Sequence, residues 1–331
     1  MQVGLVVSDT WHFFQEIAEH LQSCMDVSIF SERVHRLPFL NTKINRWQLH
    51  HDLNRLMSSV DVAYFEWASI YLVAASHLPK RCPIVTRLHQ YELYHWADQI
   101  NWEHVDKVIL VSTGMQQAFR ERLPAHAAKT VVIPGGIRLD NFRAPSRPFA
   151  GAVGTLCHLE PRKRVYELIL LFAQLLMRAP ALHLYIGGDE TPRQRDYYRA
   201  MHHLVAQLNL QSRVHFDGLI TDPATWYRKI DMFVSNSYAE GLQVAPMEAI
   251  ASGCYAVSHR WEGCDDLFPI EDTFVTQAEF EAVMLNYLSA APDTRTLQRQ
   301  RQLARVTEIC DMRRVSQQIA DVLVQTASEV A

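Results

Sequence analysis

Short apolar segments alternate with helix-like segments along most of this chain of 331 residues. Residues 3–7, 60–65, 84–88 and 108–111 are mainly apolar runs of strand length, and a polar residue follows each of them. Apolar positions at helical spacing come after the first and the last of these runs. This alternation predicts an α/β fold with parallel sheets and right-handed crossovers. Ligands bind to such sheets at the carboxyl ends of the strands.

The same alternation resumes after a break at residues 143–150, which hold two prolines and show no periodicity. Such a segment is typical of a linker. A chain of this length also exceeds what one hydrophobic core usually organises. The sequence therefore predicts two domains, residues 1–147 and residues 148–313. An apolar stripe in residues 296–328 predicts one or two amphipathic helices near the end of the chain.

The composition excludes several classes of protein. Hydrophobic residues make up 48% of the chain, which argues against disorder, and the net charge of −4 gives no reason to expect nucleic-acid binding. Six cysteines without a Cys-x2-Cys pair and 16 scattered histidines indicate neither a disulfide framework nor a metal site. The apolar start is too short for a signal peptide, and no later run reaches membrane-spanning length. We therefore expect a soluble, cytoplasmic protein.

Residues 235–253 (SNSYAEGLQVAPMEAIASG) point most clearly to a ligand. Residues 245–251 read as a helix with Pro246 in its first turn, and backbone N–H groups at such a helix start suit a phosphate. The carboxylates of Glu240 and Glu248 can accept hydrogen bonds from sugar hydroxyls on either side of a phosphate. The pattern fits a sugar–diphosphate–ribose ligand. For an isolated pair, the commoner case is a solvent-facing Glu240 and a Glu248 that complements the helix dipole.

Polar residues also stand at the ends of two first-domain strands. Glu66, Arg87 and His89 occupy the positions at which a parallel sheet binds ligands. A histidine there can hydrogen-bond a sugar hydroxyl or an attacking oxygen, since the ordinary pKa of histidine lies near working pH. A histidine that only caps the strand end is the alternative.

Five segments follow one another in a fixed order. They are residues 133–142 (IPGGIRLDNF), 154–168 (GTLCHLEPRKRVYEL), 215–218 (HFDG), 226–231 (WYRKID) and 240–253 (EGLQVAPMEAIASG). This ordered series resembles that of the retaining family-4 glycosyltransferases, which have the GT-B fold. The resemblance extends from about residue 83 to about residue 268, and it is specific to the family rather than to a substrate.

The resemblance implies two Rossmann-like domains whose parallel sheets face each other across a cleft. The C-terminal helix, about residues 314–331, would pack back on the N-terminal domain. The N-terminal domain would then lie on the acceptor side, and the C-terminal domain would bind the nucleotide-sugar donor.

The resemblance also implies an activity. A hexosyl group would pass from a UDP-, GDP- or ADP-sugar to a hydroxyl of a glycan, a glycolipid or a small-molecule acceptor, with retention at the anomeric carbon. The expected setting is surface polysaccharide or glycolipid biosynthesis. No metal and no cofactor are expected, because fixed cations and backbone dipoles stabilise the leaving diphosphate in this fold. The sequence does not predict the oligomeric state.

Site residues follow from the resemblance position by position. His89, Glu240 and Lys163 are the catalytic candidates: His89 near the reacting centre, Glu240 on the donor sugar and Lys163 on the diphosphate. Without the resemblance, a basic triplet such as the one around Lys163 is usually a solvated helix face. The donor-binding candidates are Gly154, Thr155, Arg162, Lys163, Arg164, Gly241, Leu242, Gln243, Val244, Ala245 and Glu248. The acceptor-side candidates are His12, Glu66 and Arg87.

Residues 31–59 mix basic and aromatic side chains, and such a mixture can meet an anionic lipid acceptor or the inner face of a membrane. A solvated helix face anchored by Trp47 is the favoured interpretation.

Three positions depart from the family pattern. Thr155 stands where the family commonly has an arginine, so Arg162 or Arg164 would have to supply that charge. The first strand–helix turn, residues 9–13 (DTWHF), lacks the usual pair of glycines near the donor phosphates. Gln243 stands where a glycine is frequent.

These departures keep alternatives open. One is a non-catalytic GT-B homologue that binds a nucleotide or a partner protein. Another is a GT-B sugar-nucleotide epimerase, for which no clear acid/base pair is present. A two-domain Rossmann oxidoreductase is disfavoured, because no Gly-x-Gly-x-x-Gly follows any expected strand.

Overall fold

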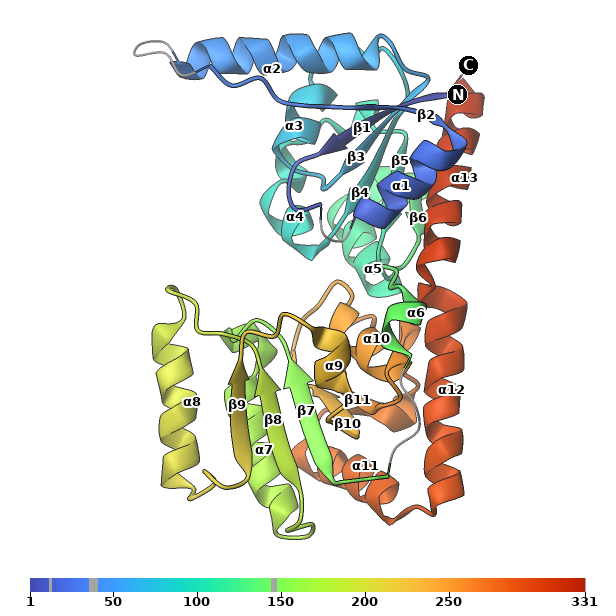
Figure 1. The fold of residues 1–331 in the computed structure, drawn as a ribbon. Coiled ribbons are helices and arrows are strands. Elements are labelled where there is room, and N and C mark those ends of the chain that lie inside the picture. Colours follow the sequence, from blue (N-terminus) through green and yellow to red (C-terminus); the bar gives the residue numbers. More distant parts are fainter. Residues whose placement is uncertain (12–13, 36–40, 144–147, 331) are drawn as a thin grey trace. The chain divides into compact units, whose positions relative to one another are not determined.

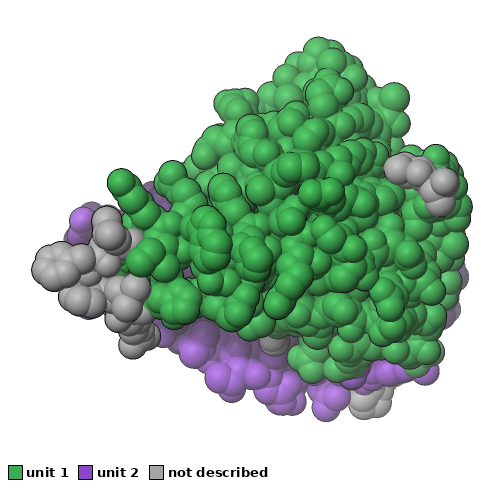
Figure 2. Space-filling model, turned by 90° about the horizontal axis from the view of Figure 1, so that it is seen from above, with its two compact units in different colours: residues 1–136, 312–331 green, residues 137–311 purple. Residues whose placement is uncertain are grey.

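The structure is a computed structural model that describes residues 1–11, 14–35, 41–143 and 148–330. The chain divides into two compact units, which Figure 2 colours separately. Unit 1 comprises Met1–Gly136 and Met312–Ala331, and unit 2 comprises Ile137–Asp311. The division falls before the boundary expected at residue 147, because the short helix α6 (Leu139–Phe142) packs within unit 2.

Unit 1 is built on a parallel sheet of six strands, in the order β2-β1-β3-β4-β5-β6 (Figure 1). The parallel α/β prediction is confirmed. Each of the apolar runs named above forms a strand of this sheet. Such runs suit a parallel sheet, because both of its faces are covered by other parts of the protein. The strands are β1 (Gln2–Val7), β2 (Asp26–Ile29), β3 (Val62–Glu66), β4 (Ile84–Leu88), β5 (Lys107–Leu110) and β6 (Thr130–Val132).

The C-terminal helix belongs to unit 1, as expected. Side chains of this helix, including Val315, Ile319 and Leu323, share one apolar cluster with α1 and with alternate residues of the sheet. On α2, Trp47 does not serve as the expected anchor: it is 64% exposed and stacks on His51 of the same helix. The helices are α1 (Gln15–Cys24), α2 (Asn41–Met57), α3 (Ile70–Ser76), α4 (Gln90–His95), α5 (Thr113–Arg122) and α13 (Met312–Val330).

Unit 2 has a second parallel sheet of six strands, in the order β12-β11-β10-β7-β8-β9. One apolar cluster contains α7, α8 and α11, and a second contains α9, α10 and α12, so helices cover both faces. The strands are β7 (Ala152–Leu156), β8 (His183–Gly187), β9 (Val214–Gly218), β10 (Met232–Ser235), β11 (Tyr255–His259) and β12 (Thr273–Phe274). The helices are α7 (Val165–Leu176), α8 (Arg195–Gln207), α9 (Pro223–Tyr227), α10 (Val244–Ala251), α11 (Gln277–Ser289) and α12 (Pro292–Cys310).

Candidate functional site

In unit 2, two cations meet one buried carboxylate at the carboxyl edge of the sheet. Lys163 ends a 3-10 turn (η4, Pro161–Lys163) after β7, and Glu240 lies in the loop after the neighbouring strand β10. The Lys163 Nζ donates to Glu240 Oε1 at 2.7 Å, and Arg162 Nη1 lies 2.6 Å from Oε2. Burial opposes ionisation, but these charges hold the pKa of Glu240 below its usual range.

Gln243 ties this loop together. Its amide oxygen accepts from the Ser235 hydroxyl, and its Nε2 donates to Ser237 Oγ at 2.9 Å and to Glu240 Oε1 at 2.8 Å. Gln243 departs from the glycine that the resemblance makes frequent at this position. In the structure it orients the Glu240 carboxylate and holds the conformation of the loop that leads into α10.

The backbone of the basic triplet is held by the same loop. Arg164 adopts the left-handed conformation, with φ 51° and ψ 39°, immediately before α7. Asn236 Nδ2 donates to its carbonyl at 2.9 Å, and Tyr238 N donates to the Arg162 carbonyl at 3.3 Å. The structure therefore directs Lys163 and Arg162 to Glu240, while Arg164 forms the backbone turn that starts the helix.

Glu248 lies on α10, eight residues after Glu240 in the sequence, and is half-buried. The Tyr227 hydroxyl donates to its Oε2 at 3.0 Å. Burial raises the pKa of Glu248 to about 7, because the hydrogen bond from the neutral Tyr227 hydroxyl offsets little of the cost of a buried charge. A ligand that supplies two hydroxyl donors would stabilise the ionised form.

The remaining donor-side candidates lie on the same two segments. Gly241 and Leu242 precede α10, and Val244 and Ala245 form its first turn. Gly154 and Thr155 lie inside β7 and are buried. An added Cβ at Gly154 would lie 2.6 Å from Ile230 Cδ1. The absence of a side chain at this position therefore lets α9 and the residues after it pack closely on β7.

Unit 1 has a separate cluster of buried polar groups at the carboxyl ends of β3 and β4. Glu66 is 1% exposed and Arg87 is 4% exposed, and Arg87 Nη1 lies 3.5 Å from Glu66 Oε1. The Tyr64 hydroxyl donates to Glu66 Oε2 at 2.7 Å. Burial raises the pKa of Glu66, although Arg87 and Tyr64 act in the opposite direction. Sequence position predicted that Glu66 and Arg87 would stand at the carboxyl ends of strands, and in the structure these two side chains also lie next to each other.

His89 adjoins this cluster. Its Nε2 lies 4.0 Å from Glu66 Oε1, and its Nδ1 lies 3.9 Å from Glu92 Oε2. Burial and the charge of Arg87 lower the pKa of His89 well below its ordinary value, so the ring is neutral at pH 7. The structure thus brings His89, Glu66 and Arg87 together within unit 1. In unit 2 it pairs Lys163 with Glu240, and Glu248 lies on α10, where it accepts from Tyr227.

Sequence reasoning missed two neighbours of His89. Trp67 stacks on the imidazole, with ring centroids 4.2 Å apart, and holds a left-handed φ of 72°. Glu92 accepts the His89 backbone N–H at 3.1 Å in a capping box that opens α4. Glu92 stands three positions after the residue at the strand end, as the glutamate of a capping box does, but His89 is not a usual cap residue, so this sequence signal is weak. No sequence signal predicts a left-handed tryptophan. His12, the third acceptor-side candidate, lies outside the described residues.

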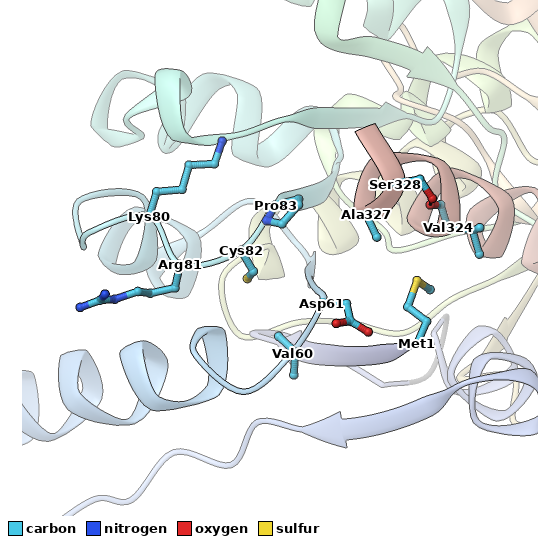
Figure 3. Close-up of a pocket in the computed structure, with 10 residues that line it drawn as sticks. All are labelled: Met1, Val60, Asp61, Lys80, Arg81, Cys82, Pro83, Val324, Ala327 and Ser328. Atoms are coloured by element: carbon cyan, nitrogen blue, oxygen red, sulfur yellow. Dashed lines mark hydrogen bonds between the residues drawn. The ribbon is translucent and has the colours of Figure 1, made fainter. Parts of the chain in front are cut away.

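A hollow of about 640 Å³ lies elsewhere on unit 1, at the amino ends of the strands (Figure 3). Its lysine is already paired, since Lys80 Nζ lies 2.6 Å from Asp106 Oδ1. Parallel sheets bind ligands at the opposite edge, so this hollow does not compete with the clusters above. Its lining residues are Met1, Val60, Asp61, Lys80, Arg81, Cys82, Pro83, Val324, Ala327 and Ser328.

Within the described ranges, no group of three His, Cys, Asp or Glu side chains is placed to hold a metal ion. Among the helices of those ranges, none combines the length and apolar character needed to span a membrane.

Two family models match the chain. The model described as Glycosyltransferase Family 4 matches residues 7–141, and the model described as Glycosyl transferases group 1 matches residues 147–288. The two matches together take in most of both units. The chain belongs to the family-4, group 1 glycosyltransferases.

This member of the family is similar over part of its length to two curated relatives. It is 27% identical over 114 residues to the lipopolysaccharide core biosynthesis mannosyltransferase LpsB of Rhizobium meliloti, covering 34% of the chain and 32% of the relative. It is 25% identical over 145 residues to the alpha-monoglucosyldiacylglycerol synthase of Streptococcus pneumoniae, covering 39% of the chain and 32% of the relative. The matched part spans about a third of the length of these relatives.

Solved structures show the fold of this family-4 chain. Anabaena HepE in complex with UDP aligns with a TM-score of 0.79 at 20% identity, over 98% of this chain and 100% of that one. Sucrose-phosphate synthase from Thermosynechococcus elongatus aligns with a TM-score of 0.76 at 16% identity, over 99% and 100% of the two chains. The fold is GT-B, as the resemblance implied.

Proposed function

We propose that this chain is a retaining glycosyltransferase that moves a sugar from a nucleotide-diphosphate sugar to an acceptor hydroxyl. The observation that carries the proposal is the unit 2 cluster, in which Lys163 and Arg162 meet Glu240 beside the start of α10. Glu248 follows on the same helix, with a carboxyl group that lacks a cationic partner among the described residues. Cations for a diphosphate and two carboxylates for sugar hydroxyls are thus present on adjoining segments.

Each group has a task in this reaction. Lys163 and the N–H groups at the start of α10 stabilise the charge that develops on the leaving diphosphate. Glu248 accepts hydrogen bonds from the ribose hydroxyls, and Glu240 orients the donor sugar. The bond between the anomeric carbon and the diphosphate oxygen breaks, and the acceptor oxygen bonds to that carbon on the same face, so the anomeric configuration is unchanged. The departing phosphate takes the proton of the acceptor hydroxyl.

The donor and the setting are proposed from the similar proteins. HepE was solved with UDP and with UDP-glucose, so a UDP-sugar is the first donor to test. LpsB is described as acting in lipopolysaccharide core biosynthesis, and the pneumococcal relative as a glucosyldiacylglycerol synthase. We therefore propose that the reaction belongs to polysaccharide or glycolipid biosynthesis. We also propose that it needs no metal ion, because Lys163 and the N–H groups at the start of α10 stabilise the diphosphate.

The test is release of nucleoside diphosphate from UDP-glucose, GDP-mannose and ADP-glucose, with water as the acceptor and with EDTA or Mg²⁺ present. We expect one donor to be consumed in EDTA. Lys163→Met should slow that reaction by about 100-fold, as removal of a transition-state donor does elsewhere. Lys229→Met is the matched control, since Lys229 forms an ion pair with Asp217 in the same unit.

Proton NMR of the first-formed sugar gives the stereochemistry. Retention predicts that the released sugar has the anomeric configuration of the donor. Release of the opposite anomer would contradict retention. Absence of turnover with every donor, although a nucleotide binds, would favour the non-catalytic homologue.

A further inference from the structure

Helix α2 presents a row of basic and aromatic side chains to solvent along the outer edge of unit 1 (Figure 1). Four exposed residues follow one another at intervals of four, which places them on one side of the helix: Lys43, Trp47, His51 and Arg55. Arg46 lies three positions after Lys43 and is exposed as well. These five residues are called the basic face of α2 below.

The opposite side of α2 is anchored in unit 1. Leu49, Leu53 and Met57 are buried. Near the start of the helix, Asn45 Oδ1 accepts from the His35 backbone N–H at 2.8 Å, and Asn45 Nδ2 donates to the His35 carbonyl at 3.1 Å. The helix is thus fixed at both ends, so the basic face is already in place before a partner binds.

The positive charge of the basic face is not offset by acidic residues on the same helix. Asp52 is the one acidic residue of α2, is 5% exposed and accepts from Arg33 Nε at 2.9 Å. Among the described residues, no carboxylate lies within ion-pair distance of Lys43, Arg46 or Arg55. The exposed side of α2 is therefore positively charged, and an anionic surface complements it.

A hollow of about 410 Å³ lies between α2 and residues 29–33, and Arg33, Asp52 and Arg55 contribute to its lining. Because the charges of Arg33 and Asp52 offset each other, Arg55 leaves the hollow with a net positive charge. Glu32 does not line the hollow, and its carboxylate accepts from the Tyr71 hydroxyl at 2.8 Å. An anionic head group therefore meets an unpaired guanidinium at this end of the basic face.

Trp47 gives the basic face its second property. Its side chain is 64% exposed, and the indole stacks on the imidazole of His51, with ring centroids 5.4 Å apart. Tryptophan is enriched where a bilayer meets water, since its ring is mainly apolar and its N–H can still find a hydrogen-bond partner. A nucleic acid is the poorer match, because it asks for a strongly basic domain and the chain has a net charge of −4.

We propose that the basic face of α2 docks unit 1 on a bilayer that contains anionic phospholipids. Trp47 lies at the level of the lipid head groups, and the cations on either side of it contact lipid phosphates. The contact is electrostatic and reversible, so added salt weakens it. This inference goes beyond the proposed glycosyl transfer and does not depend on it.

The test is co-sedimentation of the full chain with lipid vesicles. Vesicles of equal parts phosphatidylglycerol and phosphatidylcholine should bind the protein at low salt, and high salt should release it. Vesicles of phosphatidylcholine alone should leave the protein in the supernatant. A single-stranded RNA oligomer, measured by fluorescence anisotropy at the same low salt, should bind more weakly than the anionic vesicles.

Arg46→Gln should weaken binding to the anionic vesicles about 5-fold, since that is the contribution of one cation near an anionic surface. Adding Lys43→Gln should weaken it further. Both side chains are exposed, so the fold should tolerate these changes. Arg120→Gln is the matched control, because Arg120 is an exposed arginine of α5 in the same unit, and it should leave vesicle binding unchanged.

Fluorescence quenching tests the position of Trp47. Phosphatidylcholine that is brominated in its acyl chains replaces the ordinary lipid in the anionic vesicles. The bromine should quench the fluorescence of the wild type, and Trp47→Phe should remove most of that quenching. Trp11→Phe is the control, since Trp11 is also partly exposed, at 40%, but lies outside α2, and this variant should keep the quenching.

Absence of binding to the anionic vesicles, equal binding to phosphatidylcholine vesicles or unaltered binding by Arg46→Gln would overturn the proposal. Quenching that survives in Trp47→Phe would overturn it as well. Tighter binding of the RNA oligomer would assign the basic face to a nucleic acid instead. A salt-sensitive dimer that Arg46→Gln dissociates would assign it to a second copy of the chain.

The release of UDP from UDP-glucose without vesicles tests the proposed function separately. We expect the same rate for the wild type and Arg46→Gln, because α2 contributes no residue to the donor cluster of unit 2. No release by the wild type, together with intact vesicle binding, would count against the donor proposal and leave this inference standing.

Discussion

At the residue scale, the donor-side charges of unit 2 are arranged around Glu240. Lys163, Arg162 and Gln243 all contact its carboxylate. The resemblance, and not the spacing of Glu240 and Glu248 or the basic triplet by itself, predicted that these groups belong to one site. The ion pairs themselves could not be predicted, because they depend on the left-handed turn at Arg164 and on the loop that Asn236 ties to it.

Glu248 makes the stability of unit 2 depend on pH. The pKa of Glu248 in the folded protein is about 7, above the ordinary value of 4.5, so folding favours the protonated carboxyl group. The contribution of this group to the free energy of unfolding is therefore fully present below about pH 4.5 and is lost as pH rises through about 7. Glu248→Gln removes that loss. We expect the variant to gain about 1–2 kcal/mol over the wild type between pH 4.5 and pH 8, a figure reduced for partial exposure.

Urea unfolding of both proteins at the two pH values measures this difference. Glu262→Gln, which changes an exposed carboxylate of the same unit, should leave the difference near zero. Parallel pH profiles for the wild type and Glu248→Gln would show that Glu248 ionises normally in the folded protein.

At the element scale, the packing of β7 against α9 and the segment after it requires a glycine. A Cβ at position 154 would lie 2.6 Å from Ile230 Cδ1 and 2.9 Å from Trp226 Cη2. Gly154→Ala should therefore destabilise unit 2 by about 1–3 kcal/mol through overpacking. Urea unfolding measures the change. Adding Ile230→Val, which removes Cδ1, should recover part of the loss, and strictly additive effects would contradict the packing explanation.

The longer elements were predictable from sequence, and several short ones were not. Apolar runs such as residues 84–88 form strands that are buried on both faces, and Ser112 caps α5 by accepting from Met115 N at 3.1 Å. The short helices α3 and α4 have too few residues to establish a periodicity. The capping box of Thr276 and Glu279 at the start of α11 was present in the sequence but was not recognised.

At the scale of the whole molecule, the chain forms unit 1, then unit 2, and ends with a helix that returns to unit 1. The amphipathic stripe predicted the helix, but only the resemblance predicted the unit on which it packs. That assignment depends on contacts of Val315, Ile319 and Leu323 with side chains about 300 residues earlier, which no local pattern records.

The central claim is that unit 2 binds a nucleoside diphosphate through Glu248 and the cations beside Glu240. The most direct measurement is calorimetric titration of UDP, GDP and ADP, each in EDTA and in Mg²⁺, into the wild type, Glu248→Ala and the control Glu262→Ala. We predict that one nucleotide binds equally well in EDTA, and that Glu248→Ala weakens its binding at least about 10-fold while the control does not, since buried ribose hydroxyls lose their acceptor. No binding of any nucleotide, or equal binding by Glu248→Ala, would contradict the account.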